Sequence, residues 1–289
     1  MLYTAFLDEA NTHGPSPTII MACFLGNARE WVLFSRRLRG IQRRYGFKIF
    51  HATDFTNKKD EFKGWDDPKC VKLVEELTEL VRDNLTEGIT VHLERDRYDE
   101  EYRKPPIPAK MNLDSQYGVC FRACMHQIYG VVQKDGKKDR LDIVIEDGHK
   151  NAGDCGRIFD DLKMRLKSRR GIDLLGTFKR AKKASTPALM LSDFLAYSYS
   201  LMRESKAAGG IDYAAVTPEP SKKHAGLTFL ELLPDALEQL KRDFEQDRQD
   251  TADAWRARRD VRLAASAEQH RTDDRTPETL APATESGRN

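Results

Sequence analysis

The sequence has few cysteines and no long apolar segment. Its five cysteines among 289 residues are odd in number and irregularly spaced, which argues against a disulfide framework and for reduced thiols in a cytosol. No stretch approaches the ~20 apolar residues that a membrane helix needs. The first residues run into a strand-like segment without the basic start of a signal peptide. We therefore expect a soluble, cytoplasmic protein without a membrane partner.

The sequence also has no large excess of charge of one sign, and it lacks the common catalytic motifs. The formal net charge is +2, so any basic surface for nucleic acid must be local. There is no Walker loop, no Gly-rich dinucleotide fingerprint and no H-E-x-x-H zinc motif. Cys120 and Cys124 lie one helical turn apart, as metal ligands can. Since no second Cys pair or paired His accompanies them, the pattern favours core packing.

The pattern that is present predicts an α/β protein. Hydrophobic residues make up 39% of the chain, enough for a core. Apolar runs and alternation predict strands at 2–8, 18–26, 88–97, 140–147 and 172–178. Helical periodicity predicts helices at 28–45, 68–86, 115–134, 154–166, 188–202 and 228–248. This order indicates a mixed sheet covered by helices.

The C-terminal part differs in composition from the rest. Residues 1–248 carry the predicted sheet and its helices, and we expect them to form one domain. Residues 249–270 are charged and favour a helix. Residues 271–289 have almost no apolar content and predict disorder. We therefore expect a domain followed by a charged helix and a tail at 249–289.

The most informative residue is Asp193, which lies within an almost wholly apolar helix. A carboxylate buried there is costly unless it is paired, hydrogen-bonded or bound to a cation. A backbone cap or a nearby lysine would satisfy it equally well, and a lysine that neutralised Asp193 would remove the enzyme interpretation while leaving the predicted fold.

Two acidic pairs end predicted strands. Asp8 and Glu9 end the first strand, and Glu146 and Asp147 end the fourth. Neighbouring strand residues point to opposite faces, so one acid of each pair serves a site on a given face. We prefer Asp8, and we prefer Glu146 over Asp147, which precedes a glycine. Converging carboxylates are tolerated when Mg²⁺ or Mn²⁺ lies between them. Two such ions support phosphodiester hydrolysis without a nucleophilic side chain.

Four short motifs, in their order, resemble the domain-of-unknown-function 3800 family. They are F-L-D-E-A at 6–10, H-A-T-D at 51–54, I-V-I-E-D at 143–147 and L-M-L-S-D-F-L-A-Y at 189–197. The resemblance covers residues 2 to about 205. It implies a ribonuclease H-like mixed sheet flanked by helices, with the C-terminal helix as an extension, and a nuclease-type acidic site.

The resemblance also assigns roles to individual residues. Asp8, Glu146 and Asp193 match the acidic, metal-binding triad. Three further residues match accessory positions of the family: Glu9 as a further metal ligand, His51 for proton transfer or phosphate contact, and Asp54. Asp147 is a further accessory acid. His51 is equally well explained as a structural loop residue. Two departures are Ala10 in place of Ser and Met190 in place of Gln, and the second removes an amide from the site.

Basic residues precede the Asp193 helix closely. Lys179, Arg180, Lys182 and Lys183 are candidates for neutralising phosphates on a nucleic acid, as is the arginine-rich segment 36–44. A solvated surface explains each segment alone as well.

Three functions remain open. The first is a nuclease dependent on Mg²⁺ or Mn²⁺ that hydrolyses RNA or DNA. The second is a non-catalytic module that binds nucleic acid or a protein partner on the same fold. The third is a structural cation clamp. The first requires the carboxylates of Asp8, Glu146 and Asp193 to share a common point.

Overall fold

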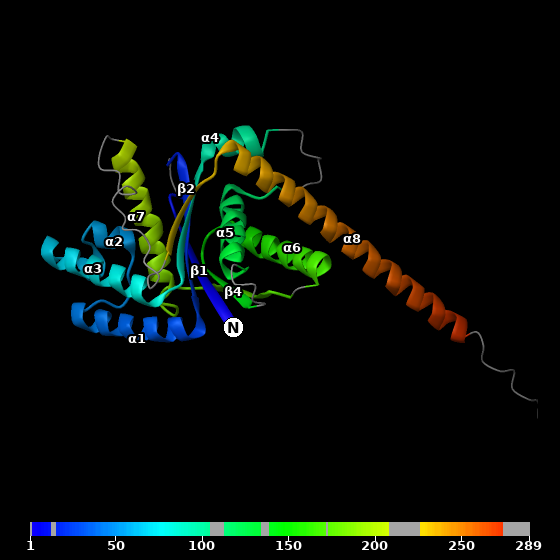
Figure 1. Ribbon diagram of the computed structural model, residues 1–289, viewed down its shortest axis with the longest axis horizontal. Helices are drawn as coiled ribbons and strands as arrows, with labels where there is room; N and C mark the ends of the chain where they lie inside the picture. Colours follow the sequence, from blue (N-terminus) through cyan, green and yellow to red (C-terminus); the bar gives the residue numbers. More distant parts are fainter. Residues whose placement is uncertain are drawn as a thin grey trace, which may run out of the picture.

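The computed structural model describes residues 2–12, 16–104, 113–133, 139–171, 173–207 and 226–273. The tail predicted to be disordered, 271–289, lies outside these residues from 274 onward, whereas residues 271–273 belong to a helix. The described parts form a sheet with helices on both faces and one long helix that extends beyond them (Figure 1).

The sheet has six strands in the order β5-β4-β1-β2-β3-β6. Their bounds are β1 Leu2–Ala10, β2 Thr18–Asn27, β3 Glu87–Glu94, β4 Arg140–Glu146, β5 Leu175–Ala181 and β6 Gly226–Glu231. β1, β2 and β3 are antiparallel neighbours, whereas β4 is parallel to β1, β5 to β4 and β6 to β3. The sheet is therefore mixed, which confirms the predicted α/β class.

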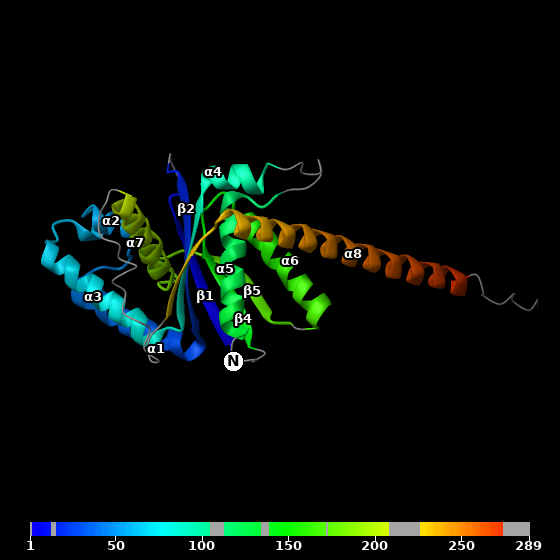
Figure 2. The same ribbon diagram turned by 45° about the horizontal axis from the view of Figure 1, so that its top comes forward.

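Helices cover the sheet in two layers (Figures 1 and 2). One face carries α1 Ala28–Tyr45, α2 Ala52–Thr56, α3 Asp67–Asn84 and α7 Leu189–Ala207. The other carries α5 Gln116–Gln133, α6 Ala152–Arg170 and the first part of α8 Pro234–Asp273. Short elements are η1 Asp60–Phe62, α4 Arg95–Arg97 and the π-helical turn η2 Tyr98–Tyr102.

Burial explains the central position of β1 and β2. All residues of β2 from Ile19 to Leu25 are buried, as expected for a strand covered on both faces. In β1, Ala5 and Leu7 belong to the core under α5 and α6. The alternate residues Phe6 and Asp8 face the α7 layer, where Ser192 of α7 donates a hydrogen bond to the Phe6 carbonyl (2.7 Å). This bond holds α7 against β1 close to the strand's carboxyl end.

The predicted helix 228–248 is wrong at its start, and at its end it runs without a break into the helix predicted at 249–270. Residues 226–231 form β6, which pairs in parallel with β3 from Glu87↔Gly226 to His92↔Glu231. The open edge of β3 supplies hydrogen-bond partners that a helix would supply internally, so tertiary pairing decides between two states that the sequence allows. The helix begins at Pro234 and continues to Asp273 across the expected boundary at 248/249.

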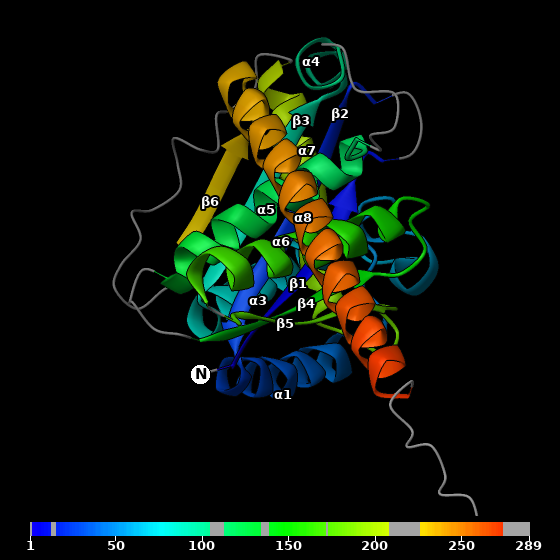
Figure 3. The ribbon, with the colours of Figure 1, turned by 90° about the vertical axis from the view of Figure 1, so that its right-hand side faces the viewer.

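α8 is anchored to α5 by buried charges. The Arg122 guanidinium is fully buried and pairs with Asp114 (2.6 Å) and with Asp247 of α8. From residue 252 to 264, every α8 side chain that the structure describes is exposed. Figure 3 shows the helix crossing α6 and extending past the body. Among the described helices, none combines the length and the apolar character needed to cross a membrane.

Candidate functional site

Three acids from distant segments meet on the α7 face of the sheet. Asp8 lies near the end of β1 and Glu146 ends the parallel strand β4, and the register Leu7↔Ile145 places these two acids side by side. Asp193 lies in the second turn of α7, which packs across β1 and β2. The carboxylates thus share one point, as the sequence analysis required.

That point is occupied by the ammonium group of Lys183. Its Nζ lies 2.8 Å from Asp8 Oδ2, 2.8 Å from Glu146 Oε2 and 3.1 Å from Asp193 Oδ2. Lys183 follows β5 and is buried. We call Asp8, Glu146, Asp193 and Lys183 the acidic cluster. The outcome that would count against an enzyme site, a lysine beside Asp193, is therefore present. Because Lys183 is buried in this cluster, it does not belong to the exposed basic surface that the sequence predicted.

Burial and like charges act on the pKa values in the cluster. Burial raises the pKa of Asp8 well above its usual value, although the Lys183 charge opposes this, and the charges of Asp193, Glu9 and Glu146 add to it. Burial alone would lower the pKa of Lys183, but the charges of Asp8 and Asp193 outweigh it and raise that pKa. One ammonium therefore balances only part of the acidic charge gathered here.

Glu9 stands beside the cluster on the opposite face of β1. Its Oε2 accepts a hydrogen bond from the Tyr117 hydroxyl of α5 (3.3 Å), and its backbone N–H donates to Asp8 Oδ1 (2.8 Å). Burial, followed by the Glu146 charge, raises the pKa of Glu9 to about 7. Glu9 thus lies next to the cluster without joining its ion pairs.

The segment after α1 contributes a backbone donor. Ala52, the first residue of α2, donates its N–H to Asp193 Oδ2 (3.1 Å). His51 precedes it at the N-cap, half-exposed, with Nδ1 3.8 Å from the same oxygen. The predicted accessory acids lie apart. Asp54 lies within α2 and takes no part in these ion pairs, and Asp147 is exposed.

The remaining predicted basic residues lie along the edge of the sheet. Lys179 and Arg180 are exposed on β5, which is an edge strand, and Lys182 is exposed directly after it. The arginines of α1 are partly neutralised, because Arg37 and Arg44 pair with Asp83 and Glu76 of α3. The β5 edge is therefore the basic surface next to the acidic cluster.

Sequence reasoning missed Lys183 as a member of the cluster. Lys183 lies in the turn after β5, and the pairing of Ala181 with Glu146 brings this turn to the end of β4. Tyr117 was also missed, because only the packing of α5 under β1 brings its hydroxyl to Glu9.

Metal ligation is not preformed. Among the described residues, no group of three His, Cys, Asp or Glu side chains is arranged to hold a metal ion. The acidic cluster shows why: its oxygens are spaced for N–H···O contacts of 2.8–3.1 Å, longer than the ~2.1 Å of a magnesium–oxygen bond. Cys120 and Cys124 are buried free thiols of α5 within the core, as core packing predicts.

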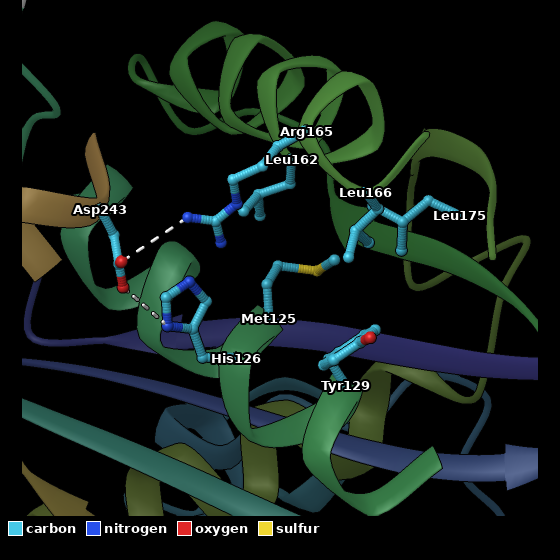
Figure 4. Close-up of a pocket in the computed structure, with 8 residues that line it drawn as sticks. All are labelled: Met125, His126, Tyr129, Leu162, Arg165, Leu166, Leu175 and Asp243. Carbon is cyan, nitrogen blue, oxygen red and sulfur yellow. Dashed lines mark ion pairs between the residues drawn. The ribbon is translucent and has the colours of Figure 1, made fainter. Parts of the chain in front are cut away.

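A cavity lies away from the cluster, between α5, α6 and α8 (Figure 4). Its volume is about 390 Å³. At its polar end Asp243 lies 3.6 Å from His126 Nδ1 and 3.6 Å from Arg165, and burial lowers the pKa of His126 to about 4. The rest of the lining is largely apolar. Because its charged groups pair with one another, this cavity indicates no particular ligand.

Comparison with known proteins adds no relative. No family model matches the chain, and no curated protein sequence matches it either.

Proposed function

We propose that this protein is a divalent-metal-dependent phosphodiesterase that cleaves RNA or DNA on a ribonuclease H-like fold. One observation carries the proposal: carboxylates from β1, β4 and α7, up to 185 positions apart in the sequence, all lie within 2.8–3.1 Å of one positive charge. Bringing like charges together inside a protein is costly.

The strand order supports the fold part of the proposal. An antiparallel β1-β2-β3 unit is extended by β4 and β5 parallel to β1. Asp8 and Glu146 lie on the parallel neighbours β1 and β4, and Asp193 lies on α7 above them. The motifs that resemble the domain-of-unknown-function 3800 family fall on these elements: F-L-D-E-A on β1, I-V-I-E-D at the end of β4 and the Asp193 motif on α7.

The donor set fits a hard divalent cation. Asp8, Glu146 and Asp193 offer carboxylate oxygens, the ligands that Mg²⁺ and Mn²⁺ prefer, and Glu9 lies beside them. These residues would hold the metal. When bound, it would supply an activated water and stabilise the leaving oxygen of a phosphodiester. Three carboxylates face the single ammonium of Lys183, so the cluster holds more acidic groups than this one cation can balance.

Lys183 then acts as an internal counter-ion. A divalent ion and an ammonium cannot occupy the same point, so metal binding requires the Lys183 side chain to withdraw. Its backbone lies in the connection between β5 and α7, where a side-chain rotation disturbs no strand pairing. Once withdrawn, the ammonium joins the exposed Lys179, Arg180 and Lys182, which we propose as contacts for phosphates.

The same lysine favours a second candidate, a non-catalytic module. If Lys183 stays in place, the acidic cluster joins β1, β4 and α7 as a buried ion network and needs no metal. The module would then bind nucleic acid or a protein partner through its surface. The two candidates differ in whether Mg²⁺ or Mn²⁺ binds the cluster.

The decisive experiment is a cleavage panel on single- and double-stranded RNA and DNA with Mg²⁺ or Mn²⁺. We expect Asp8→Asn and Asp193→Asn to abolish cleavage while circular dichroism shows an unchanged fold. Asp147→Asn, an exposed acid next to Glu146, is the matched control and should cleave normally. Equal activity of all three variants would rule out the acidic cluster as the active site.

A further inference from the structure

The part of α8 that extends beyond the sheet and its covering helices is exposed and carries an exposed tryptophan. Residues 252–264 are exposed wherever the structure describes their side chains, and the helix continues to Asp273. At 1.5 Å per residue, the 22 residues from 252 on extend about 33 Å. Within this segment Trp255 is 63% exposed, while Trp31 and Trp65 are buried. We call residues 252–273 the arm.

Between residues 252 and 264, most charged residues of the arm lie on two opposite faces of the helix. With 100° of rotation per residue, Arg258, Arg259 and Arg262 lie within about 60° of Trp255 around the helix axis. Asp253 and Asp260 lie about 140–160° from Trp255, on the opposite side. Arg248, one turn into the packed part, continues the basic face and pairs with Asp161 of α6 at 3.8 Å. The arm therefore presents one face of arginines around an exposed tryptophan.

The ion pairs of the arm leave this face with excess positive charge. Asp253 pairs with Arg256, which lies between the two faces (2.7 Å), and Asp260 contacts Arg259 at 3.5 Å. Arg258 and Arg262 make no ion pair within the part of the chain that the structure describes. An arginine that lacks an acid here keeps its guanidinium available for a phosphate.

A second copy of the chain is a poor occupant for this face. Two arms packed through it would bring arginines against arginines, which is unfavourable. A polyanion with flat rings suits it better: phosphates meet the guanidinium groups, and a base stacks on the indole of Trp255. Stacking on aromatic side chains requires unpaired bases, so the chemistry favours a single strand over a duplex.

We propose that the arm binds single-stranded nucleic acid, with Arg258, Arg259 and Arg262 on successive phosphates and Trp255 stacked on a base. The inference rests on the proposed function for the nature of the polymer. The arm leaves from the α5/α6 side of the sheet, opposite the α7 face that holds the acidic cluster (Figures 1 and 3). It therefore holds the polymer near the protein and raises its local concentration, without placing a phosphate in the cluster.

The test is fluorescence anisotropy of a labelled oligothymidylate with the full-length chain in EDTA. Three phosphate contacts on a single strand give a slope of about −2 in log K against log salt. The triple variant Arg258→Gln/Arg259→Gln/Arg262→Gln should lose this part of the slope. The matched control, Lys59→Gln/Lys63→Gln/Lys72→Gln, removes equal charge from exposed positions near and on α3 and should bind as the wild type does.

Trp255 supplies an independent readout. Since the other two tryptophans are buried, binding should quench the exposed indole's fluorescence, and Trp255→Ala should weaken binding about tenfold. Unchanged affinity and slope in the triple variant would overturn the proposal. So would a polyglutamate chain that displaces the oligonucleotide equally well, or a dimer that buries Trp255 in sedimentation analysis. Because EDTA removes metal, failure of cleavage and failure of binding are separate results.

Discussion

The ammonium nitrogen of Lys183 lies 2.8 Å from Oδ2 of Asp8, inside the protein and between two further carboxylates. Asp8 sits on a central strand paired on both sides, so it cannot retreat from this contact. Lys183 sits on a connection between β5 and α7 and can. For a metal ion to take the place of the Lys183 ammonium between the carboxylates, the Lys183 side chain must therefore move first.

Replacing Lys183 by methionine tests this relationship. Without divalent metal, Lys183→Met leaves buried carboxylates unpaired and should lower the free energy of unfolding by about 3–5 kcal/mol. Mg²⁺ or Mn²⁺ should then raise the stability of the variant more than that of the wild type, because no ammonium competes for the shared point. Urea unfolding with and without metal measures both effects.

Lys182→Met provides the control for that experiment, since Lys182 is exposed next to Lys183. It should change neither the stability in EDTA nor the response to metal. If Mn²⁺ fails to stabilise Lys183→Met, the cluster is a closed ion network and the non-catalytic module becomes the better candidate.

His92 should make the fold sensitive to acid. It is almost fully buried on β3, and burial, with smaller effects from Arg203 and Arg97 that outweigh that of Glu231, lowers its pKa from 6.5 to about 4. Between these values the unfolded chain binds a proton that the folded chain does not. The contribution of His92 to the free energy of unfolding is therefore fully present above about pH 6.5. It is lost as the pH drops to about 4, which lowers the free energy of unfolding by up to about 3 kcal/mol.

The measurement is urea unfolding at several pH values for the wild type and for His92→Gln, which cannot titrate. The variant should show a shallower fall of stability between pH 6.5 and 4. His126, with a pKa of about 4 for the same reason, contributes separately. An identical slope in wild type and variant would show that the pKa of His92 is not lowered in the folded protein.

The faces of the acidic pairs followed from the sequence because strand alternation is a local rule. It separated Asp8 from Glu9 and Glu146 from Asp147, whereas the β1–β4 register, which the sequence does not contain, places Asp8 and Glu146 on the same face. Asp193 was found from its apolar helix, where a carboxylate stands out against its neighbours. These inferences need only the period of one element.

The features that escaped prediction depend on contacts between elements. Lys183 is one of several basic residues around the end of β5, and only the parallel pairing of β5 with β4 turns it toward Glu146. Residues 226–231 have a composition compatible with a helix or a strand, and the open edge of β3 selects the strand. Propensity within one segment contains neither piece of information.

Met190 stands where the resemblance expects a glutamine, and the structure shows what it does instead. Its sulfur accepts a hydrogen bond from the Phe50 N–H (3.4 Å), and its side chain is buried in the aromatic cluster between α2 and α7.

Met190→Leu keeps the volume and should lower the free energy of unfolding by less than about 1.5 kcal/mol. Met190→Gln keeps an acceptor for Phe50 but buries two amide donors among aromatic rings. It should cost about 1–3 kcal/mol. Met190 is not one of the residues in the Lys183 ion pairs that form the cluster. We therefore expect the Met190→Leu protein to cleave nucleic acid as the wild type does. A loss of cleavage in a folded Met190→Leu protein would show that this position orients Asp193 through the Phe50–Ala52 segment.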